Sequence, residues 1–173
     1  MKIFAIFISI ILFHFQVLGQ QDFIRWNNRT KISWADFKGP IDARSPFAAM
    51  SAVGIYYKYK AQSTADIYNI SFDIYAKFDK TKAWSKKNLQ TAVILKHEQL
   101  HFDLCEIVCR AFKDALEKKR FTKNYKKEID IIFDKYFKQL QSLQQKYDSQ
   151  TMHSNNKAEE QKWDKLIKQE LLR

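Results

Sequence analysis

Glycine, proline and cysteine are scarce in this 173-residue chain, which has three glycines, two prolines and two cysteines. After Gly19 only Gly39 and Gly54 remain, so the sequence has no glycine-rich loop of the kind that cradles phosphates. Cys105 and Cys109 are four residues apart, and on one helix their Cβ vectors would make a poor disulfide. We therefore expect free buried thiols and a fold that depends on its hydrophobic core.

Acidic residues are outnumbered, since 30 Lys and Arg face 19 Asp and Glu and give a net charge of +11. Most lysines lie scattered along expected helix faces after Lys77, with no run of five like charges. This spacing favours solvated basic faces over a specific nucleic-acid site. An anionic cell-envelope surface is an alternative partner, because a positive surface attracts acidic ones.

The first residues lack the length of a membrane span. A largely apolar run from Ile3 to Phe15 follows Met1-Lys2 and ends before small residues, with Val17 and Gly19 at the −3 and −1 positions of a cleavage site. The run is too short to cross ~30 Å of hydrocarbon. We expect a signal peptide over 1–19, a secreted or periplasmic protein, and one domain over 20–173 with no transmembrane helix.

The region from Gln21 to about Phe78 is predicted to be extended. Apolar residues alternate from Tyr68 to Phe78, which indicates a strand with one buried face. Ala52–Lys60 is a second expected strand, and 62–66 is the expected turn between the two. The segment Ile32–Phe37 alternates as well.

After Trp84 the apolar period becomes helical. Ser85 is the expected cap of a helix that runs to about Lys119. A second helix is expected from Tyr125 to Lys146, an irregular polar segment over 147–156, and a last helix over 158–172. Antiparallel strands followed by three helices predict an α+β fold.

The first helix carries the segment His97-Glu98-Gln99-Leu100-His101, an HExxH pattern. On a helix the two histidines stand one turn apart on the same face and can bind one zinc ion. Glu98 is rotated by about 100° from His97 and lies beside the metal, where it can accept a proton. Zinc lowers the pKa of a bound water to about 7, so this set predicts hydrolytic chemistry with Glu98 as the base.

A third protein ligand must come from outside the pattern. Cys105 lies ~12 Å along the helix from His97, so one ion cannot contact both. Two candidates remain: His153, which is the only other histidine after residue 19, and Glu128, early in the second helix. Because the chain has only three histidines after residue 19 and two of them belong to the HExxH pattern, we favour His153 as the third ligand. Glu128 has an alternative explanation as a carboxylate at a helix start, where it suits the helix dipole.

Several segments of the chain match a known pattern; they are Ser33–Gly39, Trp84-Ser85, Leu95–Asp103 with Glu106, Tyr147-Asp148, Thr151–His153, Gln161 and Trp163. In these segments the chain resembles a bacterial family, domain of unknown function 922, described as predicted secreted zinc-dependent proteases. The resemblance implies a zincin-like peptidase with His97, Glu98 and His101 in the roles above, and it supports His153 as a ligand. One departure is Ser154, where the family pattern has glycine.

Further residues have weaker candidate roles. The Tyr147 hydroxyl is a candidate donor to an oxyanion, although core packing explains it more simply. Asp103 and Asp148 are candidates to orient the ligand imidazoles through hydrogen bonds.

The sequence therefore predicts a secreted zinc metallopeptidase acting on a peptide or protein substrate. Two other functions stay open: a zinc amidase acting on cell-envelope peptides, and a non-catalytic metal-binding or adhesion module. Replacing Glu98 by Gln separates the third function from the first two, because only an enzyme would lose turnover while keeping its metal.

Overall fold

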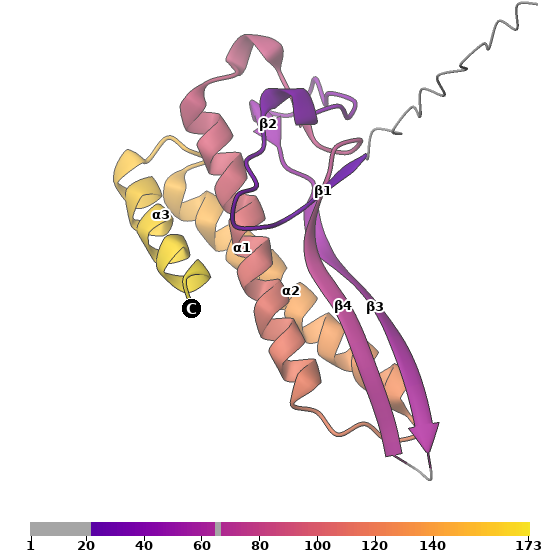
Figure 1. Ribbon diagram of the computed structural model, residues 1–173. Helices are drawn as coiled ribbons and strands as arrows, with labels where there is room; N and C mark the ends of the chain where they lie inside the picture. The colour runs from indigo at the N-terminus through magenta and orange to yellow at the C-terminus, as the bar shows by residue number, and fades with distance from the viewer. Residues whose placement is uncertain (1–21, 65–66) are drawn as a thin grey trace, which may run out of the picture.

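The computed structural model describes residues 22–64 and 67–173, so the expected signal peptide and the last residues of the expected turn at 62–66 lie outside the described residues. Within this part the α+β prediction is confirmed: antiparallel strands come first and three helices follow (Figure 1). The elements are β1 (Phe23–Arg25), η1 (Trp34–Asp36), β2 (Ala49–Met50), β3 (Val53–Thr64), β4 (Ile67–Asp79), β5 (Trp84–Ser85), η2 (Lys87–Leu89), α1 (Ala92–Glu117), α2 (Tyr125–Thr151) and α3 (Lys157–Leu171).

A long hairpin of β3 and β4 forms the body of a three-stranded antiparallel sheet with the order β1-β4-β3. Its register pairs Tyr56 with Tyr75, so the alternate residues Tyr57 and Ile74 share the opposite face. That face packs against the helices, where the Tyr57 ring lies 5.5 Å from Phe112 of α1. The two-residue period of the sequence predicted this buried face because side chains alternate across a strand.

Helix α1 is the centre of the molecule and contacts the sheet, α2 and α3 (Figure 1). Its apolar side chains join those of the sheet in one core, as where the Phe102 ring lies 5.8 Å from Phe78. Cys105 and Cys109 are free and buried in this core, as the sequence predicts. In the part of the chain that the structure describes, no helix is long and apolar enough to span a membrane.

The segment Ile32–Phe37 is not a strand, so the prediction from its alternation was wrong. It contains a short 3-10 helix, and the Asp36 carboxylate accepts hydrogen bonds from the Ser33 amide (2.9 Å) and the Ser33 hydroxyl (2.8 Å). Such local side-chain bonds compete with the backbone pairing that a strand requires.

The helix boundaries also differ at two points. Ser85 belongs to β5, which pairs with β2, and α1 begins after Thr91, whose hydroxyl accepts a hydrogen bond from Ile94 N at 3.2 Å. Helix α2 extends to Thr151 through a stretch predicted to be irregular. It stays helical because Tyr147 and Thr151 are fully buried against the rest of the fold, which outweighs a polar local sequence.

Two polar residues of α1 fasten the N-terminal segment to the helix. Gln99 accepts a hydrogen bond from Ile32 N at 2.9 Å and donates one to Asp103 at 2.9 Å. The Asp103 carboxylate also accepts from the Trp26 indole at 2.7 Å. Asp103 thus holds the N-terminal segment. Among residues 22–64 and 67–173 it has no hydrogen bond to an imidazole, contrary to one role expected for it.

Candidate metal centre

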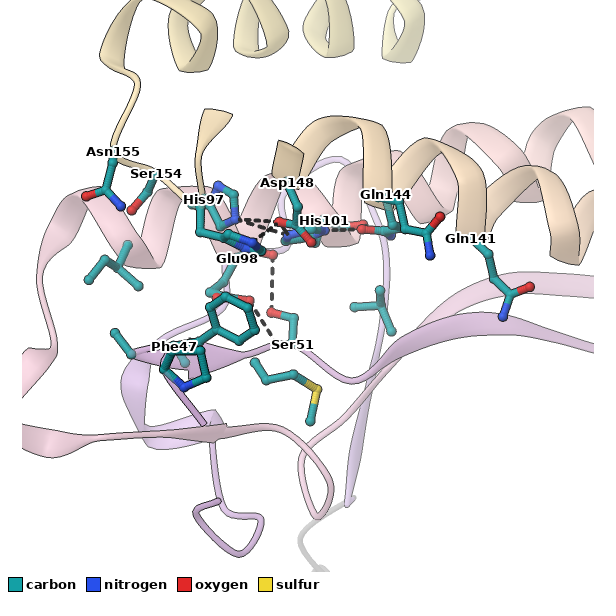
Figure 2. Close-up of a pocket in the computed structure, with 18 of the residues that line it drawn as sticks. Phe47, Ser51, His97, Glu98, His101, Gln141, Gln144, Asp148, Ser154 and Asn155 are labelled. Atoms are coloured by element: carbon teal, nitrogen blue, oxygen red, sulfur yellow. Dashed lines mark hydrogen bonds and ion pairs between the residues drawn. The ribbon is translucent and has the colours of Figure 1, made fainter. Parts of the chain in front are cut away.

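His97 and His101 project from α1 on the same side and direct their Nε2 atoms to one point (Figure 2). The two Nε2 atoms are 3.1 Å apart. Asp148 reaches the same point from α2, with its Oδ1 atom 2.9 Å from His101 Nε2 and 3.1 Å from His97 Nε2. Two donors from one helix and one from its neighbour therefore converge.

The other ring nitrogen of each histidine faces an acceptor. His97 Nδ1 lies 2.5 Å from Glu160 Oε1 of α3, and His101 Nδ1 contacts Gln144 Oε1 of α2. The Gln144 amide is oriented by its own NH2 group, which donates to the His101 carbonyl at 3.0 Å. Since both Nδ1 atoms face acceptor oxygens, we infer that each carries a hydrogen and donates it. In the neutral form of each ring the lone pair then lies on Nε2.

Lone pairs of two imidazoles and a carboxylate oxygen repel one another unless a cation lies among them. Burial opposes a charge on His97, but hydrogen bonds to Asp148 and Glu160 outweigh it and raise the pKa of His97 to about 9. Burial would raise the pKa of Asp148, yet bonds with His101 and His97 hold it well below its usual value. The centre thus favours positive charge, and this donor set could hold a metal ion.

His153 lies in the loop between α2 and α3, near the same point. Its Nδ1 atom is 3.4 Å from Asp148 Oδ1, and single donor atoms of His97, Asp148 and His153 all lie within 4.8 Å of one another. The His153 ring also packs on Phe47, with ring centroids 4.2 Å apart. Met152, His153 and Ser154 all have positive φ angles, of 50°, 50° and 73°, which non-glycine residues rarely adopt.

Glu98 is buried beside the converging donors (Figure 2). Its Oε2 atom accepts a hydrogen bond from the Ser51 amide at 2.8 Å, and the Ser51 hydroxyl donates to the Glu98 carbonyl at 3.3 Å. Ser51 follows β2 directly, so the strand position is fixed relative to this carboxylate. A carboxylate held in this way can accept a proton from a reacting group at the centre.

Of the two remaining sequence candidates, Tyr147 packs against the centre and Glu128 lies far from it. Tyr147 is fully buried and donates its hydroxyl hydrogen to Glu160 at 2.9 Å, so it contacts the site through Glu160 and by stacking on His97. Glu128 accepts hydrogen bonds from Thr122 and pairs with Lys119 near the start of α2. Twenty residues separate Glu128 from Asp148, which is ~30 Å along a helix.

Sequence reasoning overlooked Glu160 and Gln144, and it gave Asp148 only an orienting role. Asp148 lies five residues before His153, and that proximity was a clue to a shared site. Glu160 carried a weaker clue, since an acid in the first turn of α3 has the helix dipole as an ordinary explanation. Gln144 carried none, because it stands among other glutamines on a polar helix face.

The centre opens into a cleft of about 620 Å³ between the β2 segment and α2 (Figure 2). His97, Glu98, His101, Asp148 and His153 all line this cleft. A substrate can therefore reach the converging donors and Glu98 at the same time.

A family model described as "Bacterial protein of unknown function (DUF922)" matches residues 29–154. The match covers α1, α2 and His153 and ends before α3, which supplies Glu160. No curated protein and no solved structure matches the chain.

Proposed function

The chain belongs to the DUF922 family, as its sequence motifs predicted, and we propose that it is a secreted zinc-dependent hydrolase that cleaves peptide bonds. The observation that carries the proposal is the convergence of His97 Nε2, His101 Nε2 and Asp148 Oδ1 beside Glu98 in an open cleft. Two imidazoles on one helix turn, a third donor from another element and an adjacent carboxylate make up a hydrolytic zinc centre.

His97 and His101 would hold the zinc ion together with one further protein donor, Asp148 or His153, so that one position stays open for water. When bound, zinc acts as a Lewis acid that polarises water and a substrate carbonyl. Glu160 and Gln144 orient the two imidazoles through their Nδ1 hydrogens, so that both lone pairs point to the ion.

Glu98 would accept a proton from the attacking water and pass it to the leaving amine. The hydrogen bond from the Ser51 amide holds one oxygen of this carboxylate in place. General acid–base catalysis of this kind contributes about 10²–10⁴-fold to the rate.

A metal-binding module without turnover is the second candidate function. The number of donors favours it, since His97, His101, Asp148 and His153 together would complete a four-coordinate zinc site. Closed sites of this kind are structural, whereas catalytic sites keep a position open.

Zinc analysis and the Glu98→Gln variant test the proposal. We expect about one zinc per chain in wild type and in Glu98→Gln, and a loss of peptide hydrolysis of about 10²-fold or more only in Glu98→Gln. Glu106→Gln is the matched control, because Glu106 lies on the same helix and pairs with Arg110. Absence of zinc contradicts the metal centre. Bound zinc without any hydrolysis of a peptide library favours the module.

The proposed export has a separate test. Mass spectrometry of the exported form should show an N-terminus at Gln20. An intact Met1 in the membrane fraction would contradict it.

A further inference from the structure

The cleft differs in charge from the chain as a whole, which has a net charge of +11. The chain has 30 Lys and Arg residues. Among the described residues that line the cleft none is Lys or Arg, and its charged side chains besides the histidines are Glu98 and Asp148. The two carboxylates offset the charge of a divalent ion, so an anionic substrate side chain would find no cation beside it.

One helix face of α2 forms a wall of the cleft. Its lining residues recur at helical spacing and change from polar to apolar with distance from the centre; they are Asp148, Gln145, Gln144, Gln141, Leu140 and Phe137. Figure 2 shows Asp148, Gln144 and Gln141 following one another away from the histidines. Eleven residues separate Asp148 from Phe137, which is about 16 Å of helix.

The apolar end of this wall is exposed yet well supported. Phe137 of α2 is 41 % exposed, and Met50 of β2 lines the same cleft with 39 % exposed. The Phe137 ring stacks on Phe133 at 5.8 Å, and Phe133 packs on Tyr57 of the sheet at 5.0 Å. Large apolar side chains left open in a cleft and fixed from behind are typical of a binding surface.

The other end of the cleft is narrowed by a contact between its two sides. Phe47, which precedes β2, packs on His153 of the α2–α3 loop, and Ser154 and Asn155 lie beside them (Figure 2). A bound chain therefore has most room on the side of the centre that leads to Phe137.

We propose that this side of the cleft binds an extended, uncharged polypeptide segment and takes one of its large apolar side chains against Phe137 and Leu140. The inference rests on the proposed function and names its substrate class. An extended chain advances about 3.3 Å per residue, so a wall of this length spans about five residues. The apolar side chain would then lie about four or five residues from the bond that is cleaved.

Binding of labelled peptides to zinc-loaded Glu98→Gln protein tests the inference without turnover. The probes are capped octapeptides of Gly, Ser and Ala with a single Phe scanned along the chain, and the same set with Asp in place of Phe. We expect fluorescence anisotropy to give Phe peptides at least about 10-fold tighter binding than Asp peptides, as burial of one aromatic side chain implies. Equal or tighter binding of the Asp peptides overturns the inference.

The Phe137→Ser variant, made in the Glu98→Gln background, localises the preference. It should reduce the Phe-over-Asp ratio about 5-fold or more, while Ile131→Ser, an equally apolar change on an exposed part of α2 outside the cleft, should leave the ratio unchanged. A ratio unchanged in folded Phe137→Ser protein refutes the assignment. The assignment to a polypeptide is also refuted if N-decanoyl amide, which has no peptide backbone, binds as tightly as the Phe peptides.

The two proposals fail in different ways. If zinc-loaded protein binds no peptide, the substrate inference is refuted while the metal centre stands. If the Phe peptides bind but wild-type protein cleaves none of them, the hydrolase proposal is refuted and the cleft preference stands.

Discussion

The Nε2 atoms of His97 and His101 lie 3.1 Å apart, although the Nδ1 atom of each ring already faces an acceptor oxygen. With Nδ1 protonated in both rings, this contact between Nε2 atoms is stable only if a proton or a metal ion lies between them and Asp148. The residues that face Nδ1, Glu160 and Gln144, therefore determine how the two imidazoles present Nε2 to a cation.

Removing His153 should weaken zinc binding, and removing Glu128 should not. The donor atom of His153 lies within 4.8 Å of those of His97 and Asp148, whereas Glu128 is bonded to Thr122 far along α2. We expect His153→Ala to lose zinc in a competition titration with a chromogenic chelator, and Glu128→Ala to match wild type. The reverse pattern would assign the third ligand to Glu128.

Glu160→Gln should weaken zinc binding by about 10–100-fold, the usual cost of losing a partner that orients a ligand histidine. Glu160 contacts both His97 Nδ1 and the Tyr147 hydroxyl, so its charge supports the imidazole that binds the ion. Glu159→Gln is the matched control. Glu159 is the residue next to Glu160, but its carboxylate pairs with the exposed Lys162. Isothermal titration with zinc measures both. An equal loss in the two variants would indicate a general charge effect.

The sequence predicted the part of this centre that is local and missed the part that depends on packing. His97 and His101 lie one helix turn apart, so the period of α1 alone places them on one face and Glu98 beside them. Glu160 and Gln144 reach the site only because α3 and α2 pack against α1, and no local pattern encodes which acid or amide will meet which ring. The same limit explains why η1 was predicted as a strand. The alternation of apolar residues does not reveal the hydrogen bond between Ser33 and Asp36 that forms this short helix.

Asp36→Asn should destabilise the protein at neutral pH by about 1.5–3 kcal/mol, the range for hydrogen bonds to a charged group. Burial would raise the pKa of Asp36, but hydrogen bonds from Ser33 and Lys80 outweigh burial and hold the pKa below 3.8. Because the folded pKa is lowered, this stability is present above about pH 4 and lost as pH falls through the folded value. Urea unfolding of wild type and Asp36→Asn should show that the difference between their free energies of unfolding becomes smaller from pH 7 to pH 3. A difference independent of pH would mean that the charge contributes nothing.

Ser154→Gly should stabilise the fold, because Ser154 is the last of three consecutive residues with positive φ. A left-handed conformation costs a non-glycine residue about 1–2 kcal/mol, while glycine loses about 0.5–1 kcal/mol more chain entropy on folding. The balance predicts a gain of up to about 1.5 kcal/mol in the free energy of unfolding.

Ser149→Gly is the control for this change. The same substitution at this exposed position in the last turn of α2 should cost up to about 0.5 kcal/mol, since glycine is the poorer helix former. Urea titrations of the metal-free proteins measure both effects, and zinc binding by Ser154→Gly should match wild type because the His153 backbone keeps its conformation. If both variants lose stability equally, the loop is not strained at Ser154. If Ser154→Gly is more stable but binds zinc more weakly, the serine side chain restricts the loop that presents His153, and the glycine of the family pattern is not equivalent to it in this chain.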